Sequence, residues 1–159
     1  MSERIEQHKQ ALNDARAYLN RVLDAVGDQG EVQVYSDGAA WTVRQLTIHL
    51  ADADRGQSRV VMGIANGEEL IPADFDVERY NRRSVEKRAE MSIAEVRQSL
   101  NDTRAQLLEW LDSIDDATLE KQGRHANLRV LTVAEFLQVM AAHERQHADD
   151  IARVLALTV

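Results

Sequence analysis

The chain has 159 residues, a formal net charge of −8 and no cysteine. Its length suits a single domain spanning residues 1–159, and its negative charge argues against a protein that binds the phosphate backbone of nucleic acids. The absence of cysteine excludes disulfide bonds, thiolate zinc sites and a cysteine nucleophile.

Helix-breaking residues are scarce, because the chain contains 7 glycines and 1 proline. Globular proteins average about 7% glycine and about 5% proline, so we expect a mostly helical chain. The N-terminus lacks the apolar core of a signal peptide, and no apolar run approaches the roughly 18 residues needed to cross a bilayer. These features predict a cytoplasmic protein with no membrane partner.

The first predicted helix covers residues 3–26 and ends at Gly27. Its apolar residues recur at steps of three and four, which places them on one helical face. A short extended piece, Val32 to Tyr35, follows it. The predicted buried face consists of Ile5, His8, Leu12, Ala15, Leu19, Val22 and Val26.

The second predicted helix begins near Trp41 and ends at Asn66 and Gly67. Thr42 and Gln45 form the pattern of a capping box, in which two side chains satisfy free backbone N–H groups at a helix start. The predicted buried face consists of Val43, Leu46, Leu50, Ala53, Val60 and Ile64.

The same capping pattern introduces two further helices, at Ser92 with Glu95 and at Thr132 with Glu135. The buried face of the third helix is predicted to contain Ile93, Val96, Leu100, Thr103, Leu107, Trp110 and Ile114. The buried face of the fourth is predicted to contain Val133, Phe136, Leu137, Met140, Ile151, Val154 and Leu155.

The second and third helices are separated by about 25 residues, whereas connections in helical bundles usually take about 2–8 residues. This segment holds Pro72 and a charged stretch, residues 78–83, that we expect to form a short extra helix. A connection of this length can cross the bundle, so simple up-down-up-down order is not required. The predicted fold class is all-α, a four-helix bundle with a long crossover between helices two and three. A polar loop is expected from Asp115 to Leu131.

Three histidines point to a metal site. His143 and His147 lie four residues apart in the fourth predicted helix, a spacing that lets two imidazoles reach one ion. His147 interrupts the buried face and His143 borders it, and His49 lies on the buried face of the second helix. Burial of three unpaired imidazoles would be costly, and a shared divalent ion would offset that cost. The alternative is three ordinary histidines that bind no metal.

Two segments of the chain resemble motifs of a known family. The segment GAAWTVRQLTIHL, from Gly38 to Leu50, is similar to the Trp-Ser/Thr-Val-Arg motif and following histidine of the DinB-like (YfiT-like) family. The segment HERQHADDI, from His143 to Ile151, resembles that family's closing His-x3-His helix, and residues 75–81 are also in keeping with it. The resemblance extends over about residues 5–156 and implies a DinB-like four-helix bundle. The family often has a glutamine where this chain has Asp150. This difference concerns a secondary polar contact and none of the three metal ligands that the resemblance implies.

The resemblance implies a metalloenzyme whose ligands are His49, His143 and His147. Three imidazoles suit zinc, nickel, copper and iron alike, and we expect zinc or nickel. A divalent ion with an open position can activate water or a thiol, and ligand histidines must be unprotonated, so binding is expected to weaken below about pH 6.5. If these three histidines are the ligands, His147→Ala should abolish tight metal binding and His125→Ala should not.

Two classes of function stay open. The first is a metal-dependent enzyme acting on a small-molecule substrate, either a hydrolase or an S-transferase that uses a low-molecular-weight thiol such as mycothiol or bacillithiol, as characterised relatives in the family do. The second is a non-catalytic metal-binding or homodimeric interaction protein with a vestigial site. A homodimer is expected in either case. The sequence identifies no catalytic acid or base.

Other polar residues receive simpler interpretations. Glu144 is expected to form an ion pair with a neighbouring helix rather than to shuttle protons, and Asp52 to lie on a solvated helix face. His8 is expected near a frayed helix start, and His125, beside Arg124, in a plain surface loop. A basic cluster is expected to pair with surplus carboxylates rather than to attract an acidic substrate; it consists of Arg79, Arg82, Arg83, Lys87 and Arg88.

Overall fold

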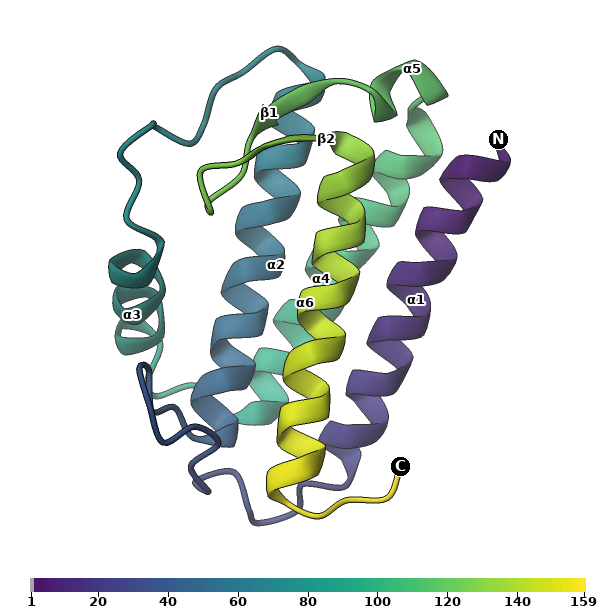
Figure 1. Cartoon of the computed structure of the whole chain (residues 1–159). Coiled ribbons are helices and arrows are strands. Elements are labelled where there is room, and N and C mark those ends of the chain that lie inside the picture. Colours follow the sequence, from purple (N-terminus) through teal and green to yellow (C-terminus); the bar gives the residue numbers. More distant parts are fainter. Residues whose placement is uncertain (1) are drawn as a thin grey trace.

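Four long helices make up most of the computed structural model, which describes residues 2–159 (Figure 1). They confirm the predicted four-helix bundle. The bounds of these helices are α1 (Glu3–Asp24), α2 (Val43–Ala65), α4 (Ile93–Ser113) and α6 (Val133–Val154).

The predicted capping boxes start three of the four helices. The Thr42 hydroxyl accepts a hydrogen bond from the Gln45 backbone N–H at 3.2 Å, and Gln45 Oε1 accepts one from the Thr42 N–H at 3.0 Å. Ser92 and Thr132 form the same reciprocal pair with their partners three residues later. The fourth start, at Ser2, has a single side-chain cap on the N–H of Ile5.

The connections between the long helices hold four shorter elements. The crossover contains the expected extra helix, which packs against α2. The segment from Asp115 to Leu131, expected to be a polar loop, instead contains one helical turn and most of an antiparallel hairpin. These elements are α3 (Val77–Lys87), α5 (Asp116–Leu119), β1 (Gln122–Arg124) and β2 (Val130–Thr132).

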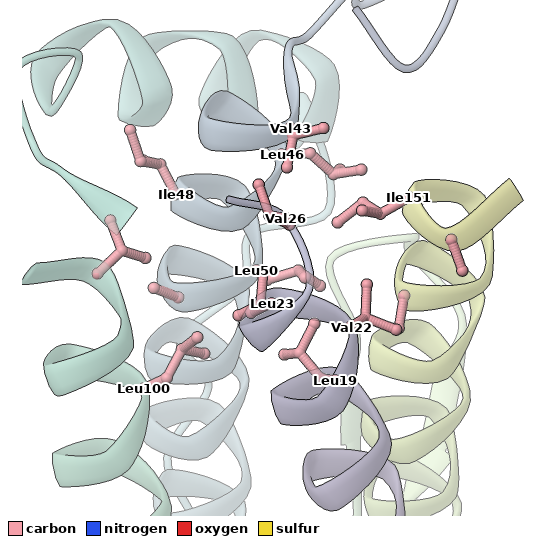
Figure 2. Packing of buried hydrophobic residues seen from close by; sticks show 14 of the residues in the cluster. Leu19, Val22, Leu23, Val26, Val43, Leu46, Ile48, Leu50, Leu100 and Ile151 are labelled. Atoms are coloured by element: carbon pink, nitrogen blue, oxygen red, sulfur yellow. The ribbon is translucent and has the colours of Figure 1, made fainter. Parts of the chain in front are cut away.

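The core consists of two apolar clusters, one at each end of the bundle. The first, shown in Figure 2, joins the C-terminal halves of α1 and α6 to the N-terminal halves of α2 and α4. The second joins the opposite halves of the same helices. The first includes Leu19, Leu46, Ile48, Leu100 and Ile151, and the second includes Leu12, Val61, Leu107, Phe136 and Leu137.

The direction of the helices follows from these clusters. Helices α1 and α6 both run from the second cluster to the first, whereas α2 and α4 run the opposite way (Figure 1). Helix α6 packs against α1 and α2, and α4 packs against the same two helices from the other side. The long crossover therefore returns the chain to the end where α2 began, and simple up-down-up-down order does not occur.

Most of the predicted buried positions are buried, with a few exceptions. Val154, expected on the buried face of the last helix, is 41% exposed because α6 ends there. Arg104 of α4, which was not predicted to be buried, is buried. The predicted positions that are only half-buried are His8, Ala53, Ile93, Thr103, Trp110, Ile114 and Leu155. Within residues 2–159 no helix has the length and apolar character needed to cross a membrane.

Candidate metal centre

The three predicted histidines meet between α2 and α6. His49 is buried on α2, and His143 and His147 are half-buried on successive turns of α6. His143 Nε2 lies 3.2 Å from His49 Nε2 and 3.1 Å from His147 Nε2. One ring nitrogen from each histidine lies within 4.8 Å of the other two. Two helices therefore bring three potential ligand atoms to one point.

The two nitrogen–nitrogen distances around His143 fit a shared ion. Two nitrogens bound to one zinc ion at about 2.0–2.1 Å lie about 2.9 Å apart at a right angle and about 3.4 Å apart at the tetrahedral angle. The distances of 3.1 and 3.2 Å around His143 fall within this interval. A ring nitrogen carries either one proton or one lone pair, so His143 Nε2 can complete only one of its two contacts by hydrogen bonding. A cation that accepts all three lone pairs removes this conflict.

Burial keeps the three imidazoles neutral. It lowers the pKa of His49 to about 3, and repulsion from the other two rings adds to the effect. It lowers the pKa of His143 to about 4 for the same two reasons, with His147 and His125 as the neighbours. It also lowers the pKa of His147, although the Asp150 carboxylate partly opposes this. At neutral pH the lone pairs are therefore free to bind a cation.

The loop between α1 and α2 supplies two aromatic contacts to the histidines. The Trp41 ring packs on His49 with centroids 4.8 Å apart. The Tyr35 hydroxyl oxygen lies 2.7 Å from His147 Nδ1 and 2.5 Å from Asp150 Oδ2. Burial and the hydrogen bond to Asp150 both raise the pKa of Tyr35, so its hydroxyl stays protonated. Residue spacing predicted neither of these contacts of Tyr35 and the Trp41 ring.

Comparison with known proteins establishes the family. The sequence from residue 5 to residue 151 matches the DinB superfamily. The chain belongs to this superfamily. The family resemblance seen in the two histidine motifs is thereby confirmed. A search of curated proteins found no match.

Three solved structures share the fold of this DinB-superfamily chain. YfiT from Bacillus subtilis, described as a probable metal-dependent hydrolase with an unusual four-helix bundle topology, has a TM-score of 0.78 at 17% identity, covering 99% of this chain and 91% of its own. A mycothiol-dependent maleylpyruvate isomerase has a TM-score of 0.77 at 16% identity, and the match covers 92% of this chain and 60% of the isomerase. The sibling lethal factor precursor DfsB has a TM-score of 0.72 at 17% identity, covering 98% and 97%. At these identities the likeness shows the fold alone.

A buried ionic layer lies next to the histidines of this DinB-superfamily protein. Glu144 accepts hydrogen bonds from Arg16 at 2.8 Å and from Arg104 at 3.2 Å, and both arginines also reach Asp54 at 3.3 Å. Each of the four long helices contributes one residue, and the two positive charges balance the two negative ones. The expected ion pair of Glu144 is confirmed. Two arginines bind its carboxylate, which fits a structural role better than a role in proton transfer.

The expectation for Asp52 is wrong. Asp52 is 5% exposed rather than solvated, because Arg55 of the same helix and Arg88 after α3 form ion pairs with it. Burial nevertheless raises the pKa of Asp52, against the opposing effect of Arg88 and Arg55. Asp52 therefore ties the crossover to α2 and lies outside the histidine cluster.

The remaining histidines also lie outside the cluster. His125 was expected in a surface loop, but it is 8% exposed and its ring packs on Phe136. Its Nδ1 accepts a hydrogen bond from the Asn127 N–H at 3.0 Å. His8 is half-buried near the start of α1, as expected, and burial lowers its pKa.

The basic cluster is only partly paired. Arg88 forms the ion pair with Asp52 at 3.3 Å. In the part of the chain that the structure describes, the other four members have no carboxylate partner; they are Arg79, Arg82, Arg83 and Lys87.

A small cavity touches the centre, and a larger groove lies beyond Trp41 without contacting the three histidines. A cavity of about 10 Å³ separates His143 from the ionic layer, too small for more than one water molecule. A groove of about 420 Å³ lies between residues 38–41 and α3, and Trp41, which packs on His49, forms part of its wall together with Arg82. The groove has the size of a small-molecule site.

Proposed function

We propose that His49, His143 and His147 bind one divalent metal ion, zinc or nickel, and that the protein is a metal-dependent enzyme acting on a small molecule. The observation that carries the proposal is the convergence of three neutral ring nitrogens within 4.8 Å. A divalent ion held by three imidazoles supplies Lewis-acid chemistry at its open positions, where water or a thiol can be activated.

The surrounding side chains would hold this centre rather than react. Trp41 covers one side of His49, and Tyr35 contacts the outer nitrogen of His147. The groove beside Trp41 is the space that we assign to the substrate, and Arg82 in its wall favours a substrate with a negative charge.

Two reactions are compatible with the same centre. Transfer to or from a low-molecular-weight thiol is supported by the absence of cysteine, since the chain has no thiolate of its own, and by the likeness of fold to the mycothiol-dependent isomerase. Hydrolysis is supported by the likeness of fold to YfiT. Added thiol should change the absorption spectrum of Co²⁺-loaded protein if thiol binding is part of the reaction.

The second candidate function is non-catalytic metal binding, in a homodimeric protein with a vestigial site. The small volume of the cavity at His143 favours it, because a substrate has no room there. A Co²⁺ spectrum that responds to neither thiols nor small anions would support this candidate over the enzyme.

Metal content tests the proposal. Untagged protein purified without chelators should contain close to one zinc or nickel ion per chain by elemental mass spectrometry, and the His49→Ala and His147→Ala variants should contain little. His8→Ala is the control, because His8 is half-buried and is not part of the three-histidine cluster, whereas His125 is buried in the core. A metal-free parent that cannot be reloaded, or equal loss in His8→Ala, would overturn the proposal.

A further inference from the structure

We propose, building on the metal function proposed above, that Tyr35 is a positioning residue that fixes the tautomer of His147. Through Tyr35, the Asp150 carboxylate holds the proton of this ring on Nδ1. Nε2 is then left with its lone pair directed at the other two histidines.

The count of protons around Tyr35 carries the argument. Its hydroxyl has one proton and two neighbours, Asp150 Oδ2 at 2.5 Å and His147 Nδ1 at 2.7 Å. A carboxylate can only accept, so the hydroxyl donates to Asp150. The short distance to Nδ1 is then a hydrogen bond only if Nδ1 carries a proton and donates it to the tyrosine oxygen. A neutral imidazole protonated at Nδ1 has its lone pair on Nε2.

Asp150 contacts His147 only through the Tyr35 hydroxyl. Its Oδ1 accepts a hydrogen bond from Gln146 Nε2 and forms an ion pair with Arg153 Nη1, each at 3.2 Å. Oδ2 is therefore left to accept from Tyr35. The distance from Asp150 Oδ2 to His147 Nδ1 is 4.0 Å, too long for a direct hydrogen bond. The hydroxyl group therefore bridges a gap that the carboxylate does not span.

The loop that carries Tyr35 is itself fixed by backbone hydrogen bonds. The Val34 N–H donates to the Trp41 carbonyl at 2.9 Å, and the Val43 N–H donates to the Val32 carbonyl at 2.9 Å. This pairing places Tyr35 and Trp41 on one short loop, with the first against His147 of α6 and the second against His49 of α2. One loop thus orients ligands on two helices.

The tautomer can be measured without any metal. In ¹⁵N NMR spectra of chelator-treated protein, His147 should show a protonated Nδ1 and an unprotonated Nε2. Asp150→Ala should invert this pattern, because the Tyr35 hydroxyl is then free to donate to Nδ1. Asp150→Asn should invert it as well, because the amide oxygen takes the place of Oδ1, toward which Gln146 and Arg153 donate, and the amide NH₂ that then faces Tyr35 cannot accept its proton. A protonated Nε2 in the parent, or a pattern in Asp150→Ala that is the same as in the parent, would overturn the proposal.

Metal affinity gives an independent readout. In Ni²⁺ titrations Tyr35→Phe should weaken binding about 10–100-fold, the usual cost of removing a group that orients a ligand histidine. Tyr18→Phe is the matched control, because the Tyr18 hydroxyl donates to Asp149 Oδ1 at 2.7 Å without contacting the histidines. Equal affinities in the two variants would contradict the role of Tyr35. A parent that binds no Ni²⁺ would refute the metal function, while the NMR pattern would still decide the tautomer.

Discussion

At the scale of single residues, the candidate metal centre joins three histidines on two helices to Tyr35 on a loop and to Asp150 on α6. The spacing of His143 and His147 and the place of His49 on an apolar stripe are local properties of a helical sequence. Tyr35 and Asp150 meet through a loop and a helix that are 115 residues apart in sequence, and no periodicity signals such a contact. Residue patterns therefore identify the candidate ligands but not the groups that orient them.

The lowered pKa values move the acid sensitivity of metal binding. Proton competition for ordinary histidines begins near pH 6.5. Because burial lowers the pKa of His49 to about 3 and that of His143 to about 4, affinity should fall mainly at lower pH than the sequence alone suggested. Ni²⁺ titrations between pH 8 and pH 5 should show a shallow decline; a full tenfold loss per pH unit already at pH 6.5 would contradict this.

The same shifts predict how the metal-free protein responds to acid. The pKa of His49 is lower in the folded than in the unfolded chain, so the unfolded chain binds more protons as the pH falls below 6.5. The free energy of unfolding should therefore decrease between pH 6.5 and about pH 3, the pKa of His49 in the folded chain. Urea unfolding of the parent and of His49→Gln should show a smaller decrease in the variant, and parallel curves would argue against a buried neutral His49.

At the scale of the elements, short-range capping signals located the helix starts. Thr42, Ser92 and Thr132 each begin a helix at the residue that follows. The hairpin of β1 and β2 was missed, because its strands have three residues each and lack a measurable alternation. Its turn contains Leu128 with a φ of 71°, a left-handed conformation that leucine rarely adopts. The residue type therefore gave no sign of the turn.

The capping box before α2 should contribute measurably to stability. Thr42→Ala removes the acceptor for the Gln45 N–H and should lower the free energy of unfolding by about 0.5–2 kcal/mol. Thr42→Ser keeps the hydroxyl and should remain close to the parent. Urea denaturation compares the three proteins, and an equal loss in the alanine and serine variants would show that the hydroxyl is not the cause.

At the scale of the whole molecule, the packing of α2 against α6 brings the three histidines together. The length of the segment between the second and third helices predicted that the chain could cross the bundle. It did not specify that α2 would pack against α6, which is the contact that brings His49 to His143. The ionic layer of Arg16, Asp54, Arg104 and Glu144 was equally hidden, since each long helix supplies only one member.

Breaking the ionic layer should destabilise the whole bundle. Glu144→Gln leaves two buried arginines with one carboxylate, and loss of one partner from a buried ion pair typically costs about 3–5 kcal/mol. Glu120→Gln is the control, because it removes the exposed partner of Arg4 and should change stability little. Similar midpoints of urea unfolding for both variants would show that the layer does not hold the helices together.

A crystal structure of the nickel-loaded protein, with anomalous diffraction recorded at the nickel edge, tests the central claim most directly. We predict one anomalous peak between α2 and α6, bonded to Nε2 of His49, His143 and His147 at about 2.0–2.2 Å, the range of metal–imidazole bonds. A peak held by carboxylates elsewhere, or by His143 and His147 without His49, would contradict the three-histidine centre.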